Sequence, residues 1–141
     1  MGLVAGAFVL CLAVLAVVVV LGRDEGAIQS DLLLSESITR AIATQPTVEL
    51  AEVAPFAWDR VLFVAPGTSR DAISERLGHK WTGIDTIDSG ELLLFLRDGN
   101  VVRFADYRGS FAFEGFARPF EELPRSRAVL TVRDRVVRPA G

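Results

Sequence analysis

The sequence predicts an α+β fold, in which one N-terminal transmembrane helix is followed by a small domain with an antiparallel sheet and one or two packed helices. Three observations predict it. Residues 1–22 carry no charged side chain, strand-like runs flank the Asp98-Gly99 dipeptide, and a helical pattern ends at Gly78. We therefore expect a transmembrane anchor over 1–22, a stalk or packing helix over 23–46 and a soluble α+β domain over 47–141.

Residues 3–21 form an unbroken apolar run. About 20 such residues in a helix cross a hydrocarbon core roughly 30 Å thick. The alternative is a cleaved signal peptide, which has a basic start and a small-x-small cleavage site, but no Lys or Arg precedes the run and Val17–Leu21 close it. We expect an uncleaved, single-pass signal anchor in the cytoplasmic membrane.

The orientation of this anchor depends on the charges beside it. Arg23 is the only basic residue near the run, so the positive-inside rule has little to count. Acidic residues follow at Asp24, Glu25, Asp31 and Glu36. We expect the soluble domain to lie outside the cytoplasm.

Composition excludes several kinds of site. The chain has a mean hydropathy of +0.36. It has 15 basic and 18 acidic residues, which give a net charge of −3 with the signs interspersed. Such a charge distribution has no basic patch of the kind that nucleic-acid binding needs. Cys11 is the only cysteine and lies in the apolar run, so no disulfide, cysteine zinc site or thiol nucleophile is expected in the soluble domain. Because His79 is the only histidine, we expect no metal site and no cofactor.

Hydrophobic periodicity predicts the first elements of the soluble part. Residues 23–45 suit an amphipathic helix that ends before Pro46, with Leu32–Leu34 facing the core or touching the membrane surface. A short extended stretch follows over 48–53, and a buried strand over 59–65. Thr68 is expected to cap a helix over 69–77.

The later part of the chain predicts strands. The runs 91–97 and 100–104 read as a tight hairpin around Asp98-Gly99, and 128–132 and 135–137 as a second hairpin around Arg133-Asp134. Between them, a cluster of aromatic residues is expected to cover one edge of the sheet: Phe111, Phe113, Phe116 and Phe120.

One combination of motifs resembles a known group. Phe56-Ala57-Trp58-Asp59-Arg60-Val61, the Pro66-x-Thr68-Ser69 turn, Leu77-Gly78 and Trp81 look like small bacterial membrane-anchored or lipoprotein-type proteins without an assigned activity. The likeness covers about half of the chain and implies a fold and a location, not a reaction.

A fainter similarity is to the small lipoprotein subunit of the bacterial outer-membrane β-barrel assembly machine, through Pro66-Gly67-Thr68-Ser69 and Leu77-Gly78. That family is lipid-anchored through a cysteine that follows a small residue. Here Leu10 precedes Cys11, so this chain departs from that pattern.

Two groups of residues are candidate binding residues. Asp59 and Arg60, which follow Trp58, could bind a ligand together. Alternatively, Asp59 could cap or pair with a neighbouring residue while Trp58 packs in the core. The aromatic residues Phe111, Phe113 and Phe116 could form a partner surface or belong to the core.

The preferred hypothesis is a membrane-tethered, non-enzymatic binding or scaffold module of the bacterial cell envelope. It would attach to the membrane through residues 3–21 and dock an envelope protein through the sheet edge and the segment 111–120. The alternative is an enzyme of unrecognised type that uses carboxylates in a cleft near Asp59 and Arg60. No complete catalytic signature is present in the sequence, which favours the binding module.

Overall fold

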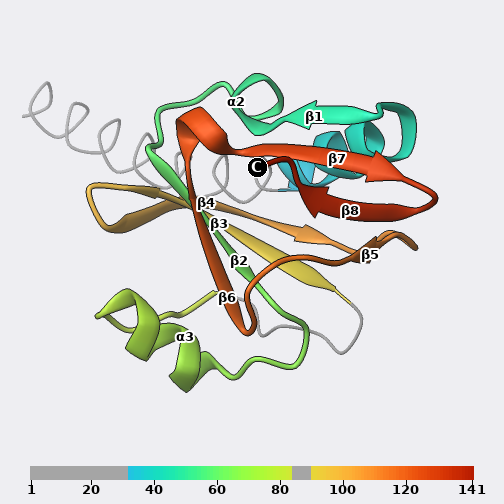
Figure 1. Ribbon diagram of the computed structural model, residues 1–141. Helices are drawn as coiled ribbons and strands as arrows, with labels where there is room; N and C mark the ends of the chain where they lie inside the picture. Colours follow the sequence, from blue (N-terminus) through green and yellow to red (C-terminus); the bar gives the residue numbers. More distant parts are fainter. Residues whose placement is uncertain (1–31, 84–89) are drawn as a thin grey trace, which may run out of the picture.

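The computed structural model describes residues 32–83 and 90–141. They form two four-stranded sheets that share a hydrophobic core, with helices packed around them (Figure 1). One sheet has the strand order β1-β7-β8-β5, and the other has the order β4-β3-β2-β6. For brevity, we call them the first and the second sheet.

The second sheet is antiparallel throughout. Its inner strands β2 and β3 are almost continuously apolar, as expected of strands that are covered on both faces. Its outer strands are β4 on one edge and β6 on the other. The bounds are β2 Arg60–Val64, β3 Glu91–Arg97, β4 Asn100–Tyr107 and β6 Phe120–Pro124.

The first sheet contains one parallel pair. Strands β7 Val129–Arg133 and β8 Val136–Pro139 form an antiparallel hairpin, and β1 Thr47–Glu49 pairs with β7. The two-residue strand β5 Ala112–Phe113 runs parallel to β8. The segment after β4 therefore crosses from the second sheet to the first before the chain returns at β6.

Side chains of β2 and β3 alternate between two cores, because successive residues of a strand point to opposite faces. Val61, Phe63, Leu93 and Phe95 point into the core shared with the first sheet and with the helix over 32–44. The opposite face packs against α3 Arg70–Leu77 and Trp81 through Leu62, Val64, Leu92, Leu94 and Leu96. The second sheet is thus the middle layer of the molecule (Figure 1).

The helix over 32–44 supplies one side of the shared core. Leu34, Ile38, Ala41 and Ile42 are buried there, at the spacing of one helix face. Leu32 and Leu33 are each 63% exposed. The predicted amphipathic helix is confirmed over 32–44, and residues 23–31 lie outside the described residues.

The predicted helix after the Pro66-Gly67 turn is confirmed, with its cap one residue later than expected. The Ser69 hydroxyl accepts a hydrogen bond from the Ala72 N–H at 3.1 Å, while the Thr68 hydroxyl donates to the Ala65 carbonyl at 2.7 Å. Gly78 ends the helix in the left-handed region with φ 77°, as glycine readily does.

Both predicted hairpins are confirmed. In the first, Asp98 and Gly99 have φ of 52° and 81°, the conformation of a tight two-residue turn between twisted strands. A register shift follows at Phe95/Leu96, which marks a bulge. In the second hairpin, the residues with positive φ are Asp134 and Arg135, one position later than expected.

The predicted fold class is wrong as stated. The strands form two sheets rather than one antiparallel sheet, because β5 and β1 attach to the β7–β8 hairpin instead of extending the sheet of β3 and β4. In the described ranges 32–83 and 90–141, no helix is long and apolar enough to cross a membrane. The predicted anchor over 1–22 lies outside them. The observed fold is a small, sheet-rich domain with a few helices.

One further local prediction is wrong. The stretch over 48–53 was expected to be extended, but β1 ends at Glu49 and a single helical turn, α2 Leu50–Val53, follows. The Leu50 N–H donates to the Ala128 carbonyl at 3.0 Å. This turn packs beside the 3-10 helix η1 Arg125–Arg127, and such a distant contact leaves no periodic signal in the sequence.

Candidate groove along the outer edge of β4

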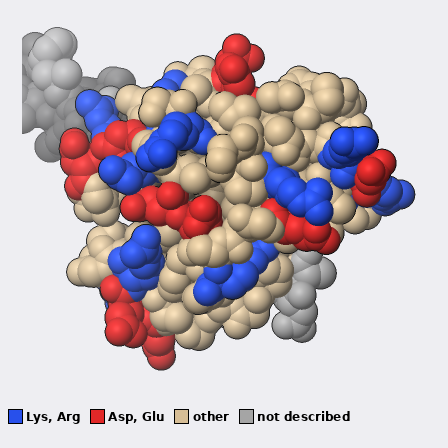
Figure 2. All heavy atoms as spheres, viewed as in Figure 1, with Lys and Arg blue, Asp and Glu red and all other residues tan. Residues whose placement is uncertain are grey.

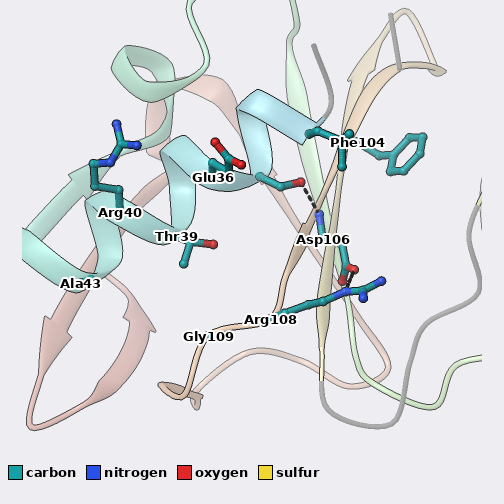
Figure 3. A pocket seen from close by; sticks show the side chains of 10 residues that line it. Glu36, Thr39, Arg40, Ala43, Phe104, Asp106, Arg108 and Gly109 are labelled. Atoms are coloured by element: carbon teal, nitrogen blue, oxygen red, sulfur yellow. Dashed lines mark hydrogen bonds and ion pairs between the residues drawn. The ribbon is translucent and has the colours of Figure 1, made fainter. Parts of the chain in front are cut away.

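The outer edge of β4 pairs with no second strand in the described part of the chain, where β4 pairs only with β3. The helix over 32–44 lies alongside this edge, and the space between them is a groove of about 810 Å³ (Figure 3). An edge strand beside a helix presents both backbone hydrogen-bonding groups and side-chain contacts to a ligand.

The helix contributes one wall of the groove. The lining positions recur every three to four residues, which places them on one face of the helix. This face is turned away from the stripe that packs into the shared core. Its residues are Leu32, Ser35, Glu36, Thr39, Arg40 and Ala43.

The other wall consists of Phe104 and Asp106 of β4 and of Arg108 and Gly109, which follow the strand. The Asp106 N–H donates to the Ser35 hydroxyl at 3.0 Å, and the Asp106 carboxylate pairs with the Arg108 guanidinium (Figure 3). Because N–H groups alternate sides along a strand, the Phe104 N–H points to the same outer edge as that of Asp106. Because the Asp106 N–H is already bonded to Ser35, the Phe104 N–H is the donor that this part of the edge directs into the groove.

A second hollow of about 470 Å³ adjoins the groove at Phe104. It lies at the other end of β4, along Val101–Phe104, and His79, Lys80 and Trp81 form its opposite wall. The Trp81 ring meets the Phe104 ring edge to face, with centroids 5.3 Å apart. Both hollows together follow the edge from Val101 to Gly109.

The predicted residues Trp58, Asp59 and Arg60 lie at the start of the inner strand β2, beside the turn between β3 and β4. Trp58 is buried, and its indole N–H donates to the Ala54 carbonyl at 2.8 Å. The Asp59 carboxylate accepts from the Asp98 N–H at 3.0 Å, whereas Arg60 contacts Glu122 at 3.4 Å. The structure therefore engages Asp59 and Arg60 with different partners.

Trp58 and Asp59 nevertheless line a shallow hollow of about 480 Å³. Arg125 closes part of it: its guanidinium lies 4.6 Å from the Trp58 ring and donates to the Phe56 carbonyl at 3.1 Å. These contacts fasten the 55–59 loop to η1. We therefore assign Arg125 a structural role, as a clamp between this loop and η1.

The predicted aromatic residues Phe111, Phe113 and Phe116 come together, but largely on the core. Phe116 is buried against Phe63, with ring centroids 4.7 Å apart, and Phe113 meets Tyr107 at 5.1 Å. Phe111 and Phe113 are partly buried. The segment thus fills the space between the two sheets, and Phe120 packs on the opposite core.

Two buried titratable groups lie near this aromatic cluster. Burial raises the pKa of the Glu91 carboxyl, although Arg118 contacts it at 2.6 Å and opposes the shift. Burial also raises the pKa of the Tyr107 hydroxyl, which accepts a hydrogen bond from the Phe111 N–H at 3.2 Å.

Among residues 32–83 and 90–141, no group of three or more His, Cys, Asp or Glu side chains could hold a metal ion.

The sequence did not point to the groove residues. The polar face of the amphipathic helix was visible in the pattern of Ser35, Glu36, Thr39 and Arg40, but such a face is usually solvated. Only the strand order shows that this face lies beside the outer edge of β4.

On the face of the molecule seen in Figure 2, basic and acidic side chains are interspersed.

A comparison with known proteins finds no matching family, no matching characterised protein and no matching solved structure. The resemblance to small membrane-anchored envelope proteins stays a prediction.

Proposed function

We propose that the protein is a non-enzymatic binding module of the bacterial cell envelope that accepts an extended polypeptide segment as an added strand on β4. Attachment to a membrane through residues 3–21 is part of this proposal. The observation that carries it is the groove between the helix over 32–44 and the outer edge of β4. The bound segment would be a piece of an envelope protein.

The shape of the groove supports an extended peptide over a compact ligand. The two hollows lie along β4 from Val101 to its end at Tyr107, and six intervals at about 3.3 Å give a length of roughly 20 Å. A peptide strand satisfies its own backbone groups by pairing with an edge, while its side chains enter pockets on alternate sides. An edge of this length suits a segment of about seven residues.

The hydrogen bond between Asp106 and Ser35 also supports this proposal. It shows that the outer edge of β4 offers N–H groups that an acceptor beside the strand can reach, at 3.0 Å in this case. Two residues earlier, the Phe104 N–H is offered in the same direction. A peptide carbonyl there would take the role that the Ser35 hydroxyl takes at Asp106.

Membrane attachment is supported by the position of the chain entry. The apolar run ends at Leu21, ten residues before Asp31, and the described chain begins with the two exposed leucines Leu32 and Leu33. The described chain would then begin within about 40 Å of the end of the apolar run, because eleven residue steps span at most about 3.6 Å each.

A display library of random octapeptides, selected against the full chain, tests the peptide part. We expect the selected peptides to lose binding to Ala43→Trp, because the indole would fill the groove. Thr44→Trp is the matched control: it adds the same side chain one residue along, outside the groove lining. Hydrogen exchange at the Phe104 amide should slow on binding. Peptides that bind both variants equally, or an unprotected Phe104 amide, would refute strand addition on β4.

The membrane part is tested separately. Cells expressing the Asn100→Cys variant in a Cys11→Ser background are fractionated, and intact cells are treated with a membrane-impermeant thiol reagent. Sedimentation with membranes and labelling of the β3–β4 turn would support attachment with the domain outside the cytoplasm. A protein that stays in the soluble fraction contradicts attachment through residues 3–21, and labelling only after lysis reverses the expected side.

A further inference from the structure

We infer that the peptide bound on β4 carries a carboxylate at the Val101 end of the edge and apolar side chains at the Gly109 end. This inference rests on the proposed function, which it deepens by naming the chemistry of the partner. It comes from the difference in charge between the two hollows that meet at Phe104.

The hollow at the Val101 end is cationic. His79 and Lys80 line it, and both are exposed. No acidic side chain belongs to its lining within the described ranges. Arg103 also lines it, but its guanidinium lies 4.6 Å from the Phe56 ring, so its charge is turned towards the shared core. Lys80 is therefore the basic group that can meet a ligand carboxylate.

The groove at the Gly109 end is different, because its charges balance. Glu36 and Arg40 on the helix, and Asp106 and Arg108 on the strand side, contribute two charges of each sign, and Asp106 already pairs with Arg108. The uncharged part of the lining includes Leu32, Ala43 and Phe104. A charged ligand side chain would find no net attraction there, whereas an apolar one can bury surface against these residues.

The two hollows lie on one strand, so a single extended segment can reach both. The buried Trp81 ring packs against Phe104 at their junction, and the partly exposed Phe104 is the apolar surface over which the peptide backbone would pass. The partner class that fits is a segment in β conformation with one acidic residue near one end, followed by alternating apolar side chains. Whether the segment runs parallel or antiparallel to β4 depends on whether its acidic residue is near its N-terminus or its C-terminus.

Rhodamine-labelled octapeptides, titrated against the full chain by fluorescence anisotropy, test this inference. The probes are Glu-Val-Thr-Leu-Thr-Val-Thr-Leu, its reversed sequence, and both with Glu replaced by Gln, all blocked at both termini. One Glu peptide should bind about two- to fivefold more tightly than its Gln partner, the range of one exposed ion pair. Lys80→Gln should abolish that difference, while Arg127→Gln, an exposed charge outside both hollows, should leave it unchanged.

The outcomes separate the two proposals. Equal affinity for Glu and Gln peptides, with no effect of Lys80→Gln, overturns the acidic preference and leaves strand addition intact, provided that Ala43→Trp still abolishes binding. If no peptide binds, or if Ala43→Trp binds as tightly as the natural chain, strand addition fails and this inference fails with it. A Gln peptide with a free C-terminal carboxylate distinguishes a terminal carboxylate from an acidic side chain as the favoured group.

Discussion

The Asp106 N–H donates to the Ser35 hydroxyl at 3.0 Å, which joins the helix over 32–44 to the outer edge of β4. The two residues are 71 positions apart in the sequence. This bond sets the width of the candidate groove at its Gly109 end, because it holds the first turns of the helix against the end of β4.

Ser35→Ala should lower the free energy of unfolding by about 1 kcal/mol, since a partly buried N–H loses its acceptor. Urea unfolding followed by circular dichroism measures the change. Ser37→Ala is the control, because it gives the same gain in helix propensity two residues along the same helix. If the two variants are equally stable, the bond contributes nothing.

The clamp formed by Arg125 provides a second prediction. Its guanidinium donates to the carbonyls of Phe56 and Ala51 and stacks on Trp58. A lysine lacks the planar guanidinium that stacks on a ring and donates several hydrogen bonds, so Arg125→Lys should lower the free energy of unfolding by about 1–2 kcal/mol. It should also change the tryptophan fluorescence of the folded protein, because Trp58 loses its stacking partner. Arg127→Lys, which is exposed in the same 3-10 helix, should change neither. Unaltered stability of Arg125→Lys would show that the clamp is not needed.

The burial of the Glu91 carboxyl predicts how stability depends on pH. Burial raises the pKa of Glu91 in the folded chain above its ordinary 4.5, so the folded state binds this proton more tightly than the unfolded state does. The resulting contribution to stability is complete below the unfolded pKa and is lost as pH rises through the folded pKa. Glu91→Gln, which cannot ionise, does not have this loss.

The test compares the unfolding free energies of the natural chain and Glu91→Gln from about pH 4 to about pH 7. We expect the variant to gain stability relative to the natural chain as the pH rises. Glu114→Gln, from an exposed pair with Arg138, should follow the natural chain closely. A difference between Glu91→Gln and the natural chain that stays constant with pH would mean that Arg118 fully offsets the burial of the carboxylate.

The local elements could be predicted from the sequence because their signals are local. Asp98-Gly99 specifies a turn with positive φ at both positions, and Ser69 and Gly78 bound α3 through contacts with residues at most four positions away. The choice of Thr68 as cap failed because two adjacent hydroxyl residues both suit the role. Only the contact of Thr68 with Ala65 decides between them.

The division into two sheets could not be predicted, because it depends on distant pairings. Strand β1 pairs with β7 about 80 residues later, and β5 has only two residues, too few for a strand pattern. The aromatic segment was hard to assign for the same reason, since Phe116 is buried by Phe63 of another strand. Most of the helix residues that line the groove are polar residues of an ordinary amphipathic helix, and only the order of the strands shows that β4 lies beside them.

The three consecutive leucines at the start of the described chain allow a final test of the packing. Leu34 is 6% exposed in the shared core, while its neighbour Leu33 is 63% exposed. Leu34→Ala removes buried methyl groups and leaves a cavity, so it should cost about 3 kcal/mol of unfolding free energy. Leu33→Ala should stay within about 0.5 kcal/mol of the natural chain. The two variants have the same composition and differ by one helical position, so helix propensity cancels between them. Equal losses would mean that the helix does not present this face to the core, and the wall of the groove would then be placed wrongly as well.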